Sequence, residues 1–410
     1  MIDNIIDNLI YINDDEKNEL KLLLNNNTNT YEYLNNKYFE IMKEWNKKYD
    51  CFDIPSCIIT ISIDGKNNYY CFGKNTYDEN TIFDIASISK LYTEFMLFNI
   101  IEDYKISLDT KISSITNLYK NISNMSFKDL ISFNHTYLTK VDIRNCNCYE
   151  DGLKALRTIY LDKELEGKYL YTDLPIMVLT DLLCLYTNKS YKELFDEYII
   201  KKYNLNDTYL QIDSDRYISL NKNYVNDPKA NIMGGYYGHA GVKTTSKDFM
   251  KFFNNCLVNN KYLDLFLTHN NTYKKDGTKA NGVALIGNIN LPLKKGFSLS
   301  SRYLTKCGFM VQGSTRCHAE TCKFIIDNNE HIVSMSLFID LYTQYDNIKK
   351  YEEKTNQTFT KEYYVNNNKL VMSDVRKLLN YRDEPSIFRM LINEISKSKI
   401  IDLYSHLKKI

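Results

Sequence analysis

Ser87 and Lys90 are the residues whose types and spacing most directly suggest chemistry. They lie in the sequence FDIASISKLYTEF, residues 83 to 95, where an extended phrase runs into an apolar helix. At that spacing the hydroxyl and the amine lie one helical turn apart on the same face. The helix N-terminus adds backbone N–H groups that can stabilise an oxyanion on a carbonyl attacked by Ser87. In a partly desolvated site Lys90 can lose its proton and accept that of Ser87, so the pattern predicts an activated serine.

The sequence around this pair is more specific than the pair itself. The Ser-x-x-Lys pattern also occurs at Ser219/Lys222, Ser396/Lys399 and Ser405/Lys408, which lack both the extended phrase and the apolar helix. With its context, the segment resembles the serine β-lactamase and penicillin-binding-protein superfamily, in the branch of class C β-lactamases, related esterases and D-alanyl-D-alanine peptidases. The resemblance implies that Ser87 is the acylated nucleophile and that Lys90 is its base.

A second phrase, GKYLYTDLPIMVL at residues 167 to 179, is similar to the family's Tyr-Ser-Asn or Tyr-Ser-Asp motif, which opens a helix lining the cleft. Tyr-x-Asp alone carries little weight in a chain with 35 tyrosines, but the text through residue 208 follows the family as well. The resemblance implies that Tyr171 relays a proton and that Asp173 orients Lys90 or the substrate. A phenol near two cations is shifted toward phenolate, which suits that relay. The alternative is that Tyr171 only caps a core helix.

A third agreement is a glycine cluster. Gly234, Gly235, Gly238 and Gly241 belong to a chain with only 14 glycines, so their clustering indicates a loop that needs positive φ or close backbone approach. The segment from Asn226 to Phe249 is similar to a family segment beside the cleft, which implies that Gly238 contacts substrate. His239 is interpreted as a hydrogen-bonded structural residue. Lys243 and Lys247 are interpreted as solvated surface charges.

The family's Lys-Thr-Gly or His-Thr-Gly triplet, on the strand beside the nucleophile, has only a divergent counterpart. We place His318 at the cation position, with Arg316 as the alternative, and this alignment has Glu320 where the family has glycine. A carboxylate there repels a substrate carboxylate and obstructs the oxyanion pocket, which favours an ester, a neutral amide or no substrate at all. The remaining expected substrate contacts are Arg316, Glu320 and Thr321.

These side chains must be positioned by strands near both ends of the chain and by helices between them. Alternating apolar residues predict a hairpin around Asp64-Gly65, and strand signals return only late in the sequence. The pattern predicts one antiparallel sheet, split in sequence, flanked by helices and joined to an all-helical subdomain. The resemblance implies a β-lactamase/transpeptidase-like α+β fold. We expect a helical extension over 1–50, the hydrolase domain over 51–345 with its helical subdomain at about 100–230, and a helical segment over 346–410.

Composition and cysteine spacing limit the kinds of partner and the compartment that we expect. With 52 basic and 51 acidic residues the net charge is +1, which argues against nucleic-acid binding through a bulk basic field. The first residues lack a secretory signal, and no apolar run is long enough to cross a bilayer. We therefore expect a cytoplasmic protein, of a cell or of a virus in its host's cytosol, whose ten cysteines are reduced. Cys146-x-Cys148 and Cys317-x4-Cys322 lack the paired spacing of structural zinc sites, so neither metal nor cofactor is expected.

The sequence thus favours a serine hydrolase that acts through an acyl-enzyme on an ester or amide, in a small-molecule or peptide-like substrate. Ser87 attacks, Lys90 and Tyr171 move protons, and backbone N–H groups of Ser87 and of the strand after His318 hold the oxyanion. One alternative is a catalytically inactive member that uses the same cleft for binding. A less favoured alternative is a penicillin-binding or β-lactam-hydrolysing enzyme. The natural substrate and the oligomeric state do not follow from the sequence.

Overall fold

The structure is a computed structural model of the whole chain. It describes residues 14–15, 18, 21–22, 28–49, 55–73, 75, 77–132, 135–165, 168–169, 172–218, 225–258, 273–274, 308–313, 317–326, 329–340, 345–356, 358, 360–365 and 368–373.

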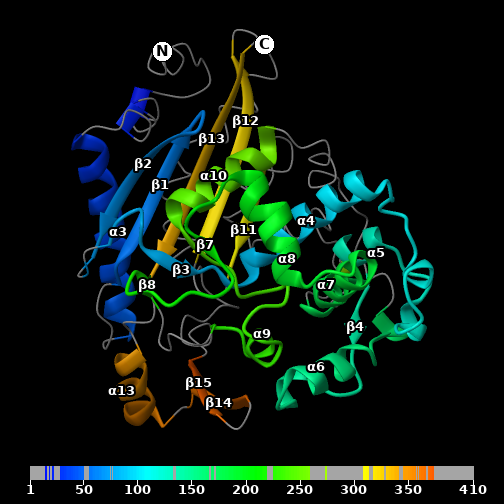
Figure 1. Ribbon diagram of the computed structural model, residues 1–410. Coiled ribbons are helices and arrows are strands. Elements are labelled where there is room, and N and C mark those ends of the chain that lie inside the picture. Colours follow the sequence, from blue (N-terminus) through cyan, green and yellow to red (C-terminus); the bar gives the residue numbers. More distant parts are fainter. Residues whose placement is uncertain are drawn as a thin grey trace.

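A five-stranded antiparallel sheet joins segments from far apart in the chain (Figure 1). In spatial order its strands are β11 (Gly308–Gln312), β12 (Cys317–Ile326), β13 (Asn329–Ile339), β1 (Cys57–Ile63) and β2 (Lys66–Phe72). The split sheet predicted from the sequence is confirmed, as is the hairpin at Asp64-Gly65, where both residues have positive φ. In this order β11 is an edge strand of the described sheet.

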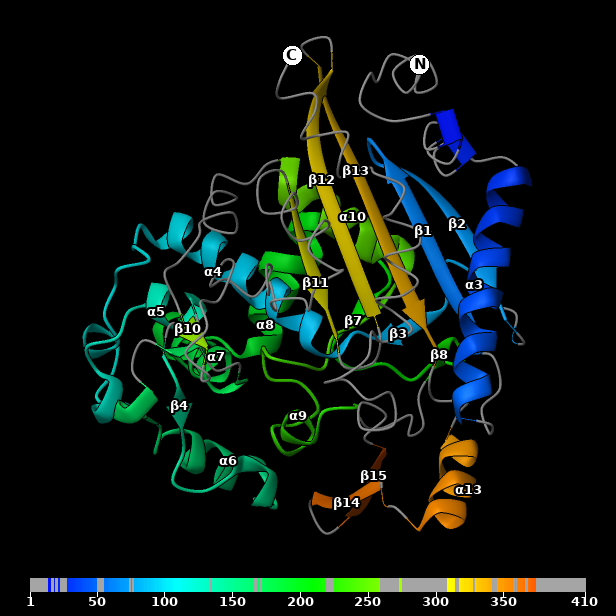
Figure 2. The same cartoon turned by 180° about the vertical axis from the view of Figure 1, so that it is seen from behind.

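Helices cover the sheet. α10 (Ser246–Val258) lies against β13, β1 and β12, in front of the sheet in Figure 1 and behind it in Figure 2. α3 (Thr28–Tyr49) lies against β2, where the fully buried Tyr38 stacks on Phe72 at 6.0 Å between ring centroids. Apolar strand residues such as Ile59 and Leu337 are therefore fully enclosed, as expected for a sheet covered by helices.

The helical block follows the first hairpin and a short strand. Its helices are η1 (Ala86–Ile88), α4 (Ser89–Tyr104), η2 (Ile112–Ser114), η3 (Lys120–Ile122), α5 (Phe127–Ser132), η4 (Ile143–Asn145), α6 (Tyr149–Leu156), η5 (Lys163–Leu165), α7 (Leu174–Thr187), α8 (Tyr191–Phe195), η6 (Asp196–Lys201) and α9 (Pro228–Ile232). α4 is buried on every side from Ser89 to Ile101, because neighbouring elements enclose both its many apolar residues and its few polar ones. Because α4 is enclosed in this way, Lys90 in its first turn and Ser87 just before it have defined positions.

Short strands tie the helical block to the sheet. The four-stranded set β7 (Thr208–Tyr209), β9 (Lys243–Thr245), β3 (Ile82–Asp84) and β8 (Tyr217–Ile218) surrounds the approach to η1. Two further pairs are β4 (Tyr137–Leu138) with β5 (Tyr160–Leu161), and β6 (Lys168–Tyr169) with β10 (Tyr273–Lys274). Because β3 leads directly into η1, its pairing with β9 orients the turn that carries Ser87.

The C-terminal segment differs from its sequence prediction. α13 (Tyr345–Thr355) is helical as expected, but β14 (Thr360–Val365) and β15 (Asn368–Ser373) form a hairpin. Neither strand alternates apolar and polar residues, but each contains a run of residues that suits a strand, Tyr363 to Val365 and Leu370 to Met372, and an asparagine-rich turn joins them. The closing helices expected after 373 lie outside the described residues.

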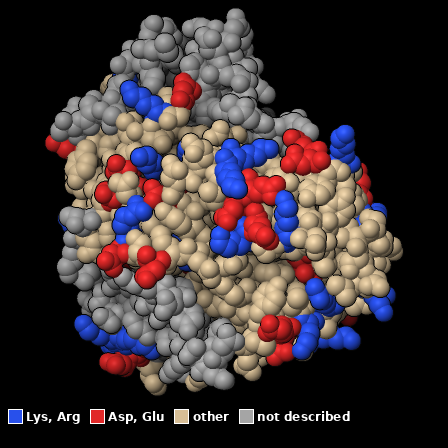
Figure 3. Space-filling model, viewed as in Figure 1, with Lys and Arg blue, Asp and Glu red and all other residues tan. Residues whose placement is uncertain are grey.

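The described surface carries mixed charge. On the face seen in Figure 3, basic and acidic side chains are interspersed rather than gathered into a field of one sign. No helix among the described residues is long and apolar enough to span a bilayer. Among the described residues, five cysteines are free thiols: Cys57, Cys71, Cys146, Cys148 and Cys184.

Candidate active site

Ser87 and Lys90 meet at the start of α4. Ser87 lies in η1 and is partly exposed, whereas Lys90, one turn later, is fully buried. The Nζ atom of Lys90 is 2.9 Å from Oγ of Ser87, which is hydrogen-bond distance. The hydroxyl of Ser87 is therefore partly exposed while the neighbouring amine is enclosed, an arrangement that suits proton transfer to a lysine base.

A buried aspartate holds the turn before Ser87. Ala86 has φ +45, an uncommon conformation for a residue other than glycine. The N–H of Ala86 donates to Oδ1 of Asp84 at 2.8 Å, and the N–H of Asn226 donates to Oδ2 at 2.7 Å. Asp84 thus joins the turn to the loop that begins at Asn226, and this bridging stabilises the strained Ala86 next to Ser87.

Lys243 lies opposite Asp84 in the β3–β9 pair and is buried, so its interpretation as a surface charge is wrong. Its Nζ donates to the carbonyls of Leu210 and Gly241 at 2.6 and 3.1 Å. Burial lowers the pKa of Lys243 to about 8, although Asp84 opposes this shift. Burial also raises the pKa of Asp84, against its N–H donors and Lys243. Both shifts show that desolvation of this pair exceeds its mutual attraction. Lys247, by contrast, is exposed as expected.

Asp173 binds two ammonium groups, one of which was not singled out in the sequence. Its Oδ1 is 2.8 Å from Nζ of Lys90, and its Oδ2 forms an ion pair with Lys229 on α9. Burial alone would raise the pKa of Asp173, but Lys229 and Lys90 hold it well below its usual range. Burial acts to lower the pKa of Lys229, yet Asp173 and Asp227 raise it above its ordinary value. Asp173 and Lys229 therefore both stay charged beside Lys90.

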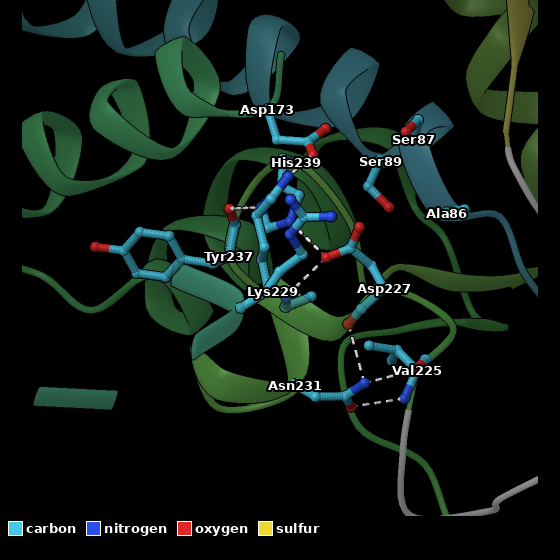
Figure 4. A network of polar contacts seen from close by, with 12 residues as sticks. Ala86, Ser87, Ser89, Asp173, Val225, Asp227, Lys229, Asn231, Tyr237 and His239 are labelled. Carbon is cyan, nitrogen blue, oxygen red and sulfur yellow. Dashed lines mark hydrogen bonds and ion pairs between the residues drawn. The ribbon is translucent and has the colours of Figure 1, made fainter. Parts of the chain in front are cut away.

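His239 closes this network from the glycine-rich loop (Figure 4). Its Nε2 is 3.0 Å from Oδ1 of Asp227, its Nδ1 is 3.0 Å from the carbonyl of Tyr237, and its own carbonyl accepts from Nζ of Lys90 at 3.1 Å. Asp227 also caps α9 by accepting from the N–H of Ala230 at 2.9 Å. Burial would raise the pKa of Asp227, but the charge and hydrogen bond of His239 lower it to about 2.

The same network contains a metal-like donor set. Ligand atoms of Asp173, Asp227 and His239 lie within 4.8 Å of one another. Both oxygens of Asp173, however, already bind the ammonium groups of Lys90 and Lys229. A metal ion would have to displace these cations, so the donor set fits a lysine-neutralised cluster better than a metal centre.

Gly238 has a packing reason to be glycine. Its φ is +69, and a Cβ there would lie 1.9 Å from Oγ1 of Thr180 on α7. Its carbonyl accepts from Oγ1 of Thr93 on α4 at 2.8 Å. Gly238 therefore lets the loop pack between the two helices. This packing accounts for the glycine without the substrate contact expected from the sequence, and that contact stays a prediction.

We expect Gly238→Ala to destabilise the protein by about 3 kcal/mol or more, because about 1–2 kcal/mol comes from positive φ and the rest from overlap with Thr180. Urea denaturation followed by circular dichroism measures this as a lower midpoint. Adding Thr180→Ala should restore only the steric part. Gly234→Ala is the control, since Gly234 has φ +89 and no heavy atom within 4 Å of its Cβ position. Equal losses for Gly238→Ala and Gly234→Ala would contradict this explanation.

Gly313 is a glycine close to Ser87 that the sequence alignment did not consider. It follows β11, and a Cβ there would lie 2.3 Å from the carbonyl oxygen of Ile85 and 3.5 Å from Cβ of Ala86. The end of the edge strand thus packs directly on the turn of Ser87. His318 instead lies on β12, paired with Gln312 on one side and Leu337 on the other. The alignment anchored on His318 left out this glycine, and the place of His318 in the third motif stays a prediction.

The remaining predicted residues are only partly described. Glu320 and Thr321 lie on β12, where they pair with Met310 and Phe309 of β11. The side chains of His318, Glu320 and Thr321 are not among the described parts of the chain. Tyr171 and Arg316 lie outside the described residues. The structure therefore brings together Ser87, Lys90 and Asp173, adds Lys229, and leaves the roles predicted for the others as predictions.

Known proteins are similar to this chain over the region that contains the site. A family model described as Beta-lactamase matches residues 50–300. The teichoic acid D-alanine hydrolase of Staphylococcus aureus is 27% identical over 187 residues, which cover 43% of this chain and 46% of that protein. The chain therefore spans about half the length of the curated relatives it matches.

Solved structures share the fold. A β-lactamase from Sulfitobacter sp. EE-36 superimposes with a TM-score of 0.53 at 12% identity, over 80% of this chain and 98% of that one. The β-lactamase/D-alanine carboxypeptidase from Pseudomonas syringae gives a TM-score of 0.52 at 15% identity, over 79% and 99%. Both similarities confirm the predicted α+β fold with its antiparallel sheet and flanking helices.

Proposed function

The chain belongs to the β-lactamase family, and we propose from that premise that it is a serine hydrolase that works through an acyl-enzyme at Ser87. The observation that carries the proposal is the 2.9 Å approach of Lys90 Nζ to Ser87 Oγ, at the point where a buried amine meets a partly exposed hydroxyl. Membership of the family supports this reading of the pair, because serine hydrolysis in that family uses this arrangement.

The reaction proceeds in two steps. Oγ of Ser87 bonds to the substrate carbonyl carbon while its proton passes to Nζ of Lys90, and the leaving group then departs with a proton. Water hydrolyses the resulting ester and frees Ser87. The N–H of Ser87, at a helix start where such groups lack an intrahelical acceptor, stabilises the oxyanion. Tyr171 remains the proposed proton relay, and Asp173 orients Lys90 through its 2.8 Å contact.

The substrate is proposed to be an ester or a neutral amide. Because Gly313 lies against the turn of Ser87, we assign the family's third triplet to Val311-Gln312-Gly313. This assignment retains the glycine but has no Lys, Arg or His in the triplet, so nothing in it attracts the carboxylate of a penicillin. The name of the Staphylococcus aureus relative makes D-alanyl groups the first acyl substrates to test.

Intact-mass spectrometry after exposure to a fluorophosphonate and, separately, to a penicillin tests the proposal. In the first reaction Ser87 Oγ bonds to phosphorus, the P–F bond breaks, and the proton and fluoride leave together. We expect the wild-type protein to gain the mass of the phosphonyl group and Ser87→Ala to gain none. We expect no stable penicillin adduct on either protein. A stable penicilloyl adduct on Ser87 would support a penicillin-binding enzyme instead. A folded protein with no Ser87-dependent adduct would point to a binding protein without catalysis.

A further inference from the structure

Lys90 has to give up its proton beside a carboxylate that favours keeping it. Asp173 is ionised, and its Oδ1 lies 2.8 Å from Nζ of Lys90. A lone carboxylate at that distance stabilises an ammonium and disfavours the neutral amine that accepts a proton from Ser87. The family also uses asparagine at this position, which carries no charge. The ionised aspartate of this chain therefore needs compensation if Lys90 is the base.

The compensation is present on α9. Lys229 pairs with the second oxygen of Asp173, and Asp173 and Asp227 keep Lys229 protonated despite its burial. The carboxylate and this ammonium together carry no net charge, so Lys90 faces a dipole rather than an anion. Oδ1 of Asp227 in turn lies 3.0 Å from Nε2 of His239. Asp173 therefore has a cationic partner of its own before Lys90 is counted.

We propose that Lys229 is a positioning residue that cancels the charge of Asp173, so that the pair acts as asparagine does and Lys90 can serve as a neutral base. The inference rests on the proposed function and adds to it the residue that sets the pH range of Ser87 activation. The contacts of Lys90 suit this role. Nζ of Lys90 lies 2.8 Å from Asp173 Oδ1, 3.1 Å from the His239 carbonyl and 2.9 Å from Ser87 Oγ, so a neutral amine can donate to the two acceptors and take the proton of Ser87.

The sequence did not reveal this role because Lys229 reads as an ordinary lysine in the first turn of a short helix. Its position is nevertheless set by the chain. Asp227 caps α9 and Pro228 begins it, which fixes the helix start and places the lysine stem toward α7. The side chain of Lys229 is one-fifth exposed, whereas that of Lys90 has no exposure, and the two lysines bind different oxygens of Asp173.

The pH dependence of fluorophosphonate labelling tests the proposal, because the variants should move the acid limb of the pH–rate profile in opposite directions. Lys229→Met leaves Asp173 with Lys90 alone, so the acid limb should move to higher pH by about one unit or more, and labelling on that limb should slow about tenfold or more. Asp173→Asn leaves the Lys229 cation unmatched, so the limb should move to lower pH. In Asp173→Asn/Lys229→Met the two changes should cancel, and the limb should return close to its wild-type position.

The other titratable groups near Lys90 are the same in all these variants. Among the described residues they are Asp227 before α9, His239 in the glycine-rich loop and Glu94 one turn further along α4. Lys192→Met is the control for loss of one positive charge, because Lys192 pairs with Asp196 on the exposed surface. That variant should leave the acid limb in place.

A second measurement separates this inference from the proposed function. In the Ser87→Ala background, the ¹³Cε resonance of Lys90, assigned by its loss in Lys90→Met, reports the protonation of Lys90 without any catalysis. Its titration midpoint should rise with Lys229→Met, fall with Asp173→Asn and return in the double variant. Failure of the wild-type protein to label would refute the hydrolase but not these shifts. Midpoints that move in the same direction in both single variants, or that do not return in the double variant, would overturn the role of Lys229.

Discussion

Lys90→Met is expected to slow the fluorophosphonate labelling of Ser87 by about 10²–10⁴-fold, the usual contribution of a positioned general base. Methionine keeps an unbranched apolar stem in the space that Lys90 fills but cannot accept a proton. The partly exposed Ser87 would remain in place, because its turn is held by Asp84 rather than by Lys90. The time course of intact-mass change at several probe concentrations gives the second-order rate constant.

The stability of Lys90→Met distinguishes loss of the base from loss of the fold. Removing one partner of a buried ion pair usually costs several kcal/mol, because the other charge is left unpaired. Here Asp173 keeps its ion pair with Lys229, so we expect a change of about 1–2 kcal/mol, as for an ordinary substitution. A labelling rate within tenfold of wild type in a folded variant would remove Lys90 from the proposed mechanism.

The sequence allowed the Ser87–Lys90 pair and the helix after it to be predicted because both depend on local information. The two residues lie three positions apart, and the mostly apolar sequence that follows them favours a buried helix. The glycine cluster was also local, and the positive φ of Gly234, Gly235, Gly238 and Gly241 confirms the backbone requirement inferred from composition.

Contacts between distant segments could not be predicted in the same way. Lys229 meets Asp173 across 56 residues, and a lysine in a polar phrase gives no sign that it is enclosed. Lys243 was misread for the same reason, since only its pairing with Asp84 in the sheet shows that it is buried. For the Lys-Thr-Gly or His-Thr-Gly triplet, the sequence alignment placed His318 at the cation position. The strand order shows that β11, which ends at Gln312, is an edge strand of the described sheet, and Gly313 after it packs on Ile85 beside Ser87.

Gly313→Ala has the second large expected effect, a loss of about 10²-fold in labelling rate. The added Cβ would lie 2.3 Å from the carbonyl oxygen of Ile85, a backbone atom that no rotamer change can move. Either β11 or the turn of Ser87 must shift, and a misplacement of about 1 Å at a reacting group costs on that scale. The overlap should also lower the free energy of unfolding by about 1–3 kcal/mol. Labelling rates and urea denaturation midpoints measured on the same preparation give both quantities.

Gly65→Ala separates the effect on the site from the effect on stability. Gly65 lies in the β1–β2 turn with φ +79 and no heavy atom within 4 Å of its Cβ position, so alanine should cost about 1–2 kcal/mol through the backbone alone. A variant destabilised in this way keeps β11 against the turn of Ser87 and should label at the wild-type rate. If Gly313→Ala labels as fast as Gly65→Ala, the contact between β11 and Ile85 does not position the nucleophile. The assignment of the third triplet to Val311-Gln312-Gly313 would then lose its physical basis.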